Sequence, residues 1–342
     1  MPYKSLRIQN FTVFPDADFT FSKGINAYVG VNGSGKTHLL KLLYALQKHQ
    51  VLYADATSRE PLDVTLMSVF NPDSLGRLVR RQRGVQRTRI SATWNAKTLE
   101  VDFSSRDQKV DRERLWKLGV HPVLIPAKDI LGHSVNFADA YDSTTVGGGR
   151  WLDFDVTFRD LLTHANPDVP RGPVPAEQQP LLEVLREQMS GTVVKSKTGR
   201  FYLKDSAGKI EFPLVAEGWR KLGLLWVLIR NGSLTKGSAL YWDEPESNLN
   251  PAMFPMIADI LAQLARSGTQ LHIATHSYAL IREMEFAARR HGSPLQYFSL
   301  DRNTRDVTVR PCKKFADLTP NPILDEYERI YRLAVEEALA NV

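Results

Sequence analysis

Residues 30–37 read Gly-Val-Asn-Gly-Ser-Gly-Lys-Thr, so two glycines bracket four residues and a Lys-Thr pair follows. This is the spacing of a phosphate-binding loop. Its glycines allow the backbone to curl with the N–H groups pointing inward, where a Cβ atom would obstruct a phosphate. Lys36 is suited to the β- and γ-phosphates, and the Thr37 hydroxyl to Mg²⁺. The residues predicted to hold a nucleoside triphosphate, with ATP and Mg²⁺ as cofactors, are Asn32, Gly33, Ser34, Gly35, Lys36, Thr37 and His38.

A second set of reactive side chains follows two apolar segments. Asp243 and Glu244 come directly after Leu-Tyr-Trp, and His276 comes after Leu-His-Ile-Ala-Thr. An aspartate at a strand end can reach Mg²⁺ through water, the next glutamate can polarise an attacking water, and a histidine nearby can contact the γ-phosphate. Each of these residues alone is more often a surface or capping residue. In this order they predict Glu244, His276 and Lys36 as catalytic residues, and Thr37 and Asp243 as metal ligands.

These side chains need a sheet whose strands end at one edge. Residues 25–29 predict a buried strand before the glycine loop and residues 38–46 an apolar-periodic helix after it, which disfavours the alternative of a glycine turn that binds nothing. From residue 240 onward, strands alternate with helices, which predicts a parallel α/β sheet.

The rest of the chain divides less clearly. Alternation predicts strands at 6–11 and 18–21, and a hairpin at 88–94 and 98–103. Helices are predicted at 64–83, 216–230 and 325–341, the last of them amphipathic, and a helix or loop at 107–117. A small meander is predicted over 193–212, and Gly147–Gly149 predict a break.

Taken together, the glycine loop, the Asp243-Glu244 pair, the loop 245–250 and His276 resemble the ABC-type ATPase domain. The opening residues 6–11 make the chain similar to the branch that holds the SMC, RecF and OLD-like ATPases, including its standalone defence-type members without a coiled coil. The resemblance covers 1–50 and 210–300 with specific motifs. It implies an α/β fold: an ABC-ATPase head with N-terminal antiparallel strands, a parallel P-loop core sheet and a mixed α+β insertion. The predicted core is 1–50 and 210–310, the insertion 51–209, and the C-terminal strand and helix 311–342.

The resemblance also implies that two heads pack head to tail around ATP. The signature segment is then 215–219, where Gly218 would meet the γ-phosphate bound by the partner and Ala216 departs from the usual serine. Ser247 is a further predicted nucleotide contact. Several roles stay open. Arg220 or Lys221 could contact a phosphate or lie on a plain helix surface. Lys128 or Asp129 could replace the family's glutamine, with Gln82 and Gln86 as weaker candidates, and Phe11 or Phe14 could stack on adenine or lie in the core.

Composition sets further limits. The formal net charge of +6 comes from 44 basic and 38 acidic residues, which permits nucleic-acid binding without requiring it. With one cysteine, Cys312, no intrachain disulfide is possible, and no run of eighteen apolar residues occurs, so we expect a cytoplasmic protein that does not enter a membrane. The basic residues gather in one segment, which is either a solvated surface or a DNA contact: Arg77, Arg80, Arg81, Arg83, Arg87 and Arg89.

Two functions follow as hypotheses. The first is an ATP-hydrolysing switch, a homodimer or higher homo-oligomer, that controls an effector (a nuclease or toxin) in trans in antiviral defence; the roughly forty residues after Leu300 are too few for a nuclease domain. The second is a DNA-binding repair ATPase. The altered signature disfavours a transporter subunit, and a small-molecule kinase does not explain Glu244, Ser247 and His276 together.

Overall fold

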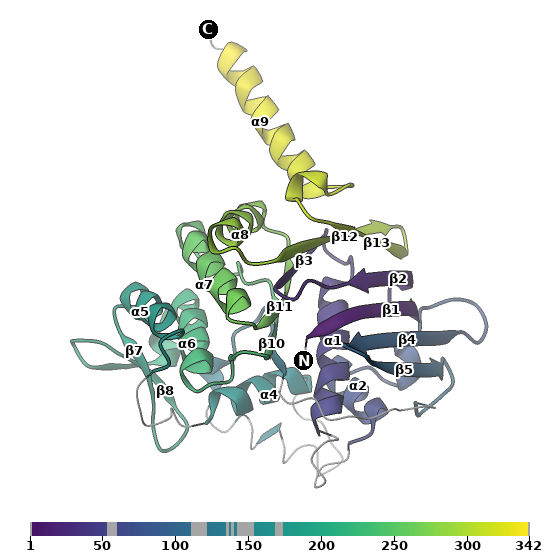
Figure 1. The fold of residues 1–342 in the computed structure, drawn as a ribbon, viewed down its shortest axis with the longest axis horizontal. Coiled ribbons are helices and arrows are strands. Elements are labelled where there is room, and N and C mark those ends of the chain that lie inside the picture. Colours follow the sequence, from purple (N-terminus) through teal and green to yellow (C-terminus); the bar gives the residue numbers. More distant parts are fainter. Residues whose placement is uncertain are drawn as a thin grey trace.

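Two sheets meet around one buried helix. The computed structural model describes residues 2–52, 60–110, 122–134, 137, 140–141, 154–167 and 174–340. In these residues, helix α1 (Lys36–Leu52) lies between the sheets (Figure 1). Tyr3 of one sheet donates to the Leu43 carbonyl at 2.7 Å, and Tyr241 of the other donates to Gln47 Oε1 at 2.5 Å. The predicted α/β head is confirmed.

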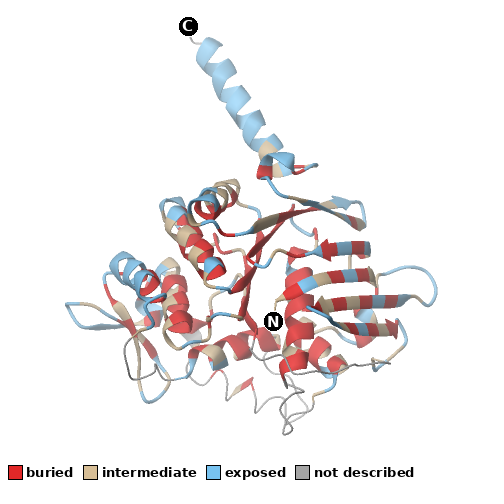
Figure 2. Cartoon of the chain, viewed as in Figure 1, coloured by how far each residue is buried: buried red, intermediate tan, exposed pale blue. Residues whose placement is uncertain are grey.

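The core sheet has the order β13-β12-β3-β11-β10-β6. Its three central strands are buried at every position, as expected of parallel strands covered on both faces (Figure 2). Because parallel strands point the same way, β3, β10 and β11 end at one edge, where crevices for ligands form. The strands are β3 (Ile25–Val29), β6 (Pro122–Ile125), β10 (Ala239–Asp243), β11 (Gln270–Thr275), β12 (Leu295–Asn303) and the antiparallel β13 (Asp306–Cys312).

The second sheet is antiparallel, with the order β2-β1-β4-β5. The predicted strands and the hairpin are confirmed as β1 (Tyr3–Phe11), β2 (Phe14–Thr20), β4 (Arg87–Trp94) and β5 (Lys97–Ser104). Thus β4 and β5 join the N-terminal strands, and β6 joins the core sheet, although all three fall within the predicted insertion. Residue 51 is therefore not a structural boundary. The sequence could not show this, because the identity of a strand's partner leaves no local pattern in the chain.

The predicted helix over 64–83 is wrong. Helix α2 (Leu62–Phe70) ends where Asn71 takes a left-handed φ of 52° and donates its N–H to the Met67 carbonyl. Pro72 follows, which lacks the N–H that a continuing helix needs. Only a short 3₁₀ turn, Leu75–Leu78, comes after it. The chain between α2 and β4 is thus free to form the wall of a pocket.

The remaining elements follow the predicted pattern. The meander is the three-stranded sheet β7 (Thr192–Lys195), β8 (Phe201–Lys204) and β9 (Lys209–Glu211). Helix α9 (Pro322–Ala340) has no buried residue and projects from the body (Figures 1 and 2). No helix in the described ranges has the length and apolarity to cross a membrane. Residues 111–117, Gly147–Gly149 and Asn341 lie outside the described residues. The other helices are α4 (Val156–Ala165), α5 (Gln179–Gln188), α6 (Glu217–Arg230), α7 (Phe254–Arg266) and α8 (Tyr278–His291).

Candidate active site

The glycine loop between β3 and α1 forms a cradle. Gly33 and Gly35 have φ angles of +77° and +85°, a left-handed conformation that favours glycine. A Cβ atom on Gly35 would lie 2.6 Å from Val13 and 2.9 Å from Phe14. The loop lines a pocket of about 300 Å³ with the start of α1, whose first N–H groups have no acceptor within the helix. This backbone offers the donors and the positive helix end that a phosphate requires.

Lys36 is held inside this cradle. Its ammonium is buried and donates to the carbonyls of Gly30 at 2.7 Å and Val31 at 3.0 Å. Burial lowers the pKa of Lys36, and the charges of Asp243, Glu244 and Glu246 oppose that shift. The predicted phosphate ligand therefore lies at the pocket, with acidic side chains nearby.

Thr37 and Asp243 meet as the metal prediction requires. The Thr37 hydroxyl donates to Asp243 Oδ2 at 2.7 Å, and Asp243 Oδ1 is buried with no hydrogen-bond partner among the described residues. A hydroxyl beside an unpaired carboxylate oxygen fits a hard cation such as Mg²⁺. The described residues contain no group of three His, Cys, Asp or Glu side chains that could hold a metal ion by itself, and phosphate oxygens and water would complete the coordination of Mg²⁺ here.

The buried charge of Asp243 makes the site sensitive to pH. Burial raises the pKa of Asp243, although the hydrogen bond from Thr37 opposes the shift. Protons should thus compete with Mg²⁺ at a higher pH than for an ordinary aspartate. We expect Mg²⁺-dependent nucleotide binding, followed by titration calorimetry, to weaken as pH falls through that raised pKa.

The variant Asp243→Asn tests the same charge. It should lose Mg²⁺-dependent binding. Because the folded-state pKa lies above the unfolded one, the ionised carboxylate lowers stability at neutral pH, so the variant should melt at a higher temperature without nucleotide. A lower melting temperature in differential scanning calorimetry would contradict this account.

Glu244 and His276 come together at the ends of β10 and β11. Glu244 has a positive φ of 48°, and its N–H donates to the Ala274 carbonyl at 2.9 Å. His276 Nδ1 lies 3.4 Å from Glu244 Oε1. Sequence reasoning missed Glu246, whose Oε1 accepts from Thr275 Oγ1 at 2.7 Å and from the His276 N–H at 3.0 Å. Its other oxygen is buried and unpaired in the described part of the chain. The acidic run 243–246 was the available signal.

Lys221 holds the turn that carries Glu244. It is buried on α6 and donates to the Ser247 carbonyl at 2.6 Å, to the Ser247 hydroxyl, and to the Glu244 carbonyl at 3.5 Å. Burial lowers the pKa of this ammonium. The Ser247 hydroxyl has two acceptors within its own chain for its one proton, the Glu244 carbonyl at 2.8 Å and the Ala127 carbonyl at 3.2 Å. Its contact with nucleotide stays a prediction.

We expect Lys221→Met to destabilise the protein and slow turnover together. Methionine matches the length but leaves the Ser247 carbonyl without its lysine donor, which costs about 1–3 kcal/mol of unfolding free energy. The Glu244 turn also loses its anchor. Thermal melts and phosphate release measure both effects, with Lys209→Met on the exposed strand β9 as control. Unchanged melting would show that the contacts do not hold the turn.

The signature segment packs against the loop after β10. A Cβ atom on Gly218 would lie 3.0 Å from the Asn248 carbonyl, and Asn248 donates to Glu217 at 2.7 Å. The Ala216 cap makes no side-chain hydrogen bond. Arg220 pairs with Asp129 at 2.6 Å instead of facing the pocket. Within this chain, Gly218 is therefore not at the glycine loop, and a role for it requires a second copy.

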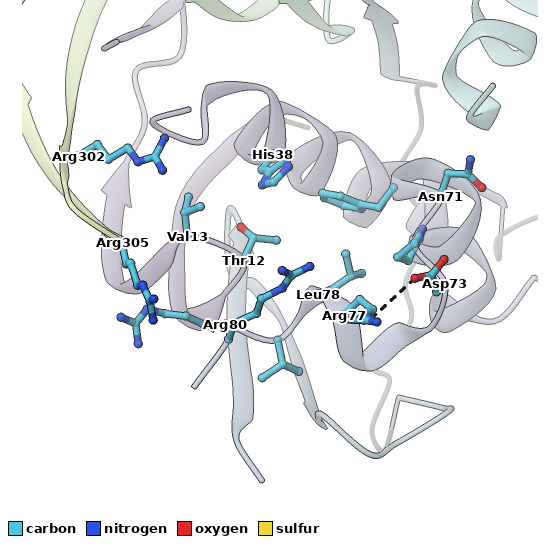
Figure 3. Close-up of a pocket in the computed structure, with 14 residues that line it drawn as sticks. Thr12, Val13, His38, Asn71, Asp73, Arg77, Leu78, Arg80, Arg302 and Arg305 are labelled. Atoms are coloured by element: carbon cyan, nitrogen blue, oxygen red, sulfur yellow. Dashed lines mark ion pairs between the residues drawn. The ribbon is translucent and has the colours of Figure 1, made fainter. Parts of the chain in front are cut away.

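Phe11 and Phe14 are core aromatics, the second of the two roles left open for them. Both are fully buried, and they offer no surface to adenine. Instead, a larger cavity of about 820 Å³ adjoins the glycine-loop pocket and shares Val13 and His38 with it (Figure 3). His38 and Phe70 meet edge to face there, with ring centres 6.0 Å apart.

The candidates for the family's glutamine do not line either of these two cavities. They are Gln82, Gln86, Lys128 and Asp129.

The basic segment is largely neutralised by acids. Arg80 pairs with Asp306, Arg87 and Arg89 pair with Asp102, and Arg77 lies 3.8 Å from Asp73. In the described ranges, Arg81 and Arg83 have no acidic partner. The surface thus offers less positive charge than the sequence suggests.

Comparisons with known proteins agree with this arrangement. Residues 5–117 match the family described as "AAA domain", and residues 125–282 the family described as "AAA domain, putative AbiEii toxin, Type IV TA system". The DNA replication and repair protein RecF of Cytophaga hutchinsonii is 44% identical over 46 residues, 14% of this chain and 12% of that protein. RecF of Francisella tularensis subsp. novicida is 34% identical over 80 residues, 22% of this chain and 23% of that protein. The chain thus spans less than a quarter of these relatives.

Solved structures share the fold at low identity. The SmcHead bound to the C-winged helix domain of ScpA aligns with a TM-score of 0.56 and 11% identity, over 92% of this chain and 98% of that one. An Smc head with an extended coiled coil, bound to the C-terminal domain of ScpA derived from Pyrococcus furiosus, aligns with a TM-score of 0.50 and 9% identity, over 97% of this chain and 99% of that one.

Proposed function

Because this chain belongs to the AAA/ABC-type ATPases with an SMC- and RecF-like head, we propose that it hydrolyses ATP as a homodimeric switch that controls an effector in trans. ATP would join two copies and hydrolysis would release them. ADP lacks the γ-phosphate, so the two nucleotides favour different states of the pair.

The convergence of five side chains at one sheet edge carries the proposal. Lys36 and Thr37 start α1, Asp243 and Glu244 end β10, and His276 follows β11. Thr37 and Asp243 would hold Mg²⁺, which supplies charge stabilisation to the phosphates. Glu244 would take a proton from water, and His276 would orient that water.

The two joined cavities fit the two ends of a nucleotide. The smaller one, at the glycine loop, would hold the phosphates. The larger one, beyond Val13 and His38, would hold the ribose and base against Phe70. The Phe70 ring and the His38 ring offer flat apolar surfaces for a base.

Exposed apolar side chains support contacts with other chains. Leu214 and Trp219 flank the N-terminus of α6 and are 76% and 39% exposed, where a second head would meet Gly218. Helix α9 exposes Tyr331 and Leu339, at 73% and 71%. Large exposed apolar patches mark interaction sites. The ScpA domain bound to the SmcHead supports a protein partner for this chain as well, and the exposed face of α9 is a candidate surface for it.

Phosphate release and particle mass test the proposal together. The purified protein should release phosphate from ATP in a Mg²⁺-dependent reaction. Its mass, measured by light scattering, should double with a non-hydrolysable ATP analogue but not with ADP. A protein that neither hydrolyses ATP nor changes mass would refute the switch.

A DNA-binding repair ATPase is the second candidate. The RecF alignments favour it, as do Arg81 and Arg83, which have no acidic partner in the described ranges. DNA binding with the ATP analogue present should weaken steeply with salt and on replacing both arginines by alanine. No DNA binding at low salt would remove this candidate.

A further inference from the structure

The β12–β13 hairpin carries an arginine onto the glycine loop. A Cβ atom built on Gly33 would lie 2.1 Å from Arg302 Nη1 and 3.3 Å from Arg302 Cζ. The guanidinium therefore rests directly on the Gly33 backbone. Arg302 also lines the larger cavity, and its side chain extends from the hairpin (Figure 3). It thus lies where the two cavities meet.

Two contacts fix the hairpin at this place. The Val307 N–H donates to the Val13 carbonyl at 3.1 Å, and Val13 lines both cavities. Asp306 forms an ion pair with Arg80 from the opposite wall. Arg302 is paired with Val307 in the strand register, so these contacts set its position as well.

Arg302 itself has no acidic partner among the residues that the structure describes. It is exposed, whereas the neighbouring Arg80 is neutralised by Asp306. Lys36, the other cation of the loop, is buried and bonded to main-chain carbonyls. An unpaired guanidinium at the mouth of an anion cradle is suited to phosphate oxygens, which it binds with two parallel donors.

We propose that Arg302 is a second phosphate ligand, which contacts the bound nucleotide from the side opposite Lys36. This inference rests on the proposed nucleotide site and deepens it. Lys36 acts from inside the loop as a point charge, and Arg302 acts from outside as a planar fork. The hairpin thereby encloses the phosphates between two cations of the same chain.

Nucleotide affinities of Arg302→Ala test the proposal. Fluorescent ATP and ADP should bind about tenfold more weakly or worse, since a charged hydrogen bond is lost, while adenosine should bind as to the wild type. The dependence of ATP affinity on salt should also flatten. Arg302→Lys keeps the positive charge but not the two parallel donors, so its ATP affinity should lie between those of the wild type and Arg302→Ala. The control is Arg310→Ala, which lies on the same hairpin but donates to the Thr319 carbonyl away from the cavities.

The outcomes separate this inference from the proposed function. If the wild type binds no nucleotide, the proposed function fails. If the wild type binds ATP and Arg302→Ala binds it equally well, only the role of Arg302 is overturned. Tighter binding by Arg302→Ala would also overturn it, because Arg302 would then block the cradle. An equal loss of affinity for adenosine and ATP would also overturn it, because the substitution would then have damaged the pocket as a whole. Arg302→Ala and Arg302→Lys should both melt at the wild-type temperature, which excludes a folding defect.

Discussion

Replacing Glu244 with glutamine is expected to slow ATP hydrolysis by about 10²–10⁴-fold, the usual contribution of a general base. Glutamine has nearly the shape of glutamate. It also keeps the backbone N–H that donates to the Ala274 carbonyl and anchors the positive-φ turn at this position. It cannot take the proton of the attacking water. Phosphate release under single-turnover conditions measures the loss directly.

The same variant should still bind ATP. Lys36, Thr37 and Asp243 remain in place, so the nucleotide affinity should stay within about threefold of the wild type. ATP that is bound but not cleaved should hold copies together, and light scattering should show dimers with ATP itself. Glu187→Gln, on the exposed side of α5, is the matched control.

Unchanged turnover would move the base to another group. Glu246 is then the first candidate, because its Oε2 is buried and unpaired in the described residues and its Oε1 lies 3.6 Å from His276 Nδ1. A normal rate in both glutamine variants would exclude this acidic turn as the source of the base.

Replacing Lys36 with alanine should weaken ATP binding by at least tenfold and by up to about a hundredfold, because hydrogen bonds to charged groups contribute about 1.5–3 kcal/mol. The ammonium would exchange its present acceptors, the carbonyls of Gly30 and Val31, for phosphate oxygens. Titration calorimetry with ATP measures the loss. Lys4→Ala, on the exposed face of β1, is the control.

The lowered pKa of Lys36 adds a pH signature. Burial makes the ammonium lose its proton at a lower pH than an ordinary lysine. Wild-type ATP affinity should therefore decline as pH rises through that lowered pKa, and the Lys36→Ala profile should lack the decline. Parallel profiles for the two proteins would show that another group is responsible.

Sequence alone determined the parts of the site that are local in the chain. The glycine loop is one uninterrupted segment, so its left-handed Gly33 and Gly35 and the helix after them follow from neighbouring residues. The buried strands that end at Asp243 and Thr275 are also local patterns, and their parallel arrangement brings their ends together. This is why the core of the site was predictable.

Only the tertiary structure decided contacts between distant segments. It placed Thr37 against Asp243, 206 residues away, and left the other Asp243 carboxylate oxygen without a hydrogen-bond partner in the part of the chain that the structure describes. It placed Lys221 under the Glu244 turn, neither at a phosphate nor on a plain helix surface, and it placed Arg302, which belongs to no motif, on Gly33. Strand pairing and ion pairing depend on which surfaces meet, and no periodicity in the chain encodes that. For the same reason, arginines that read as a basic patch proved largely to be paired with acids.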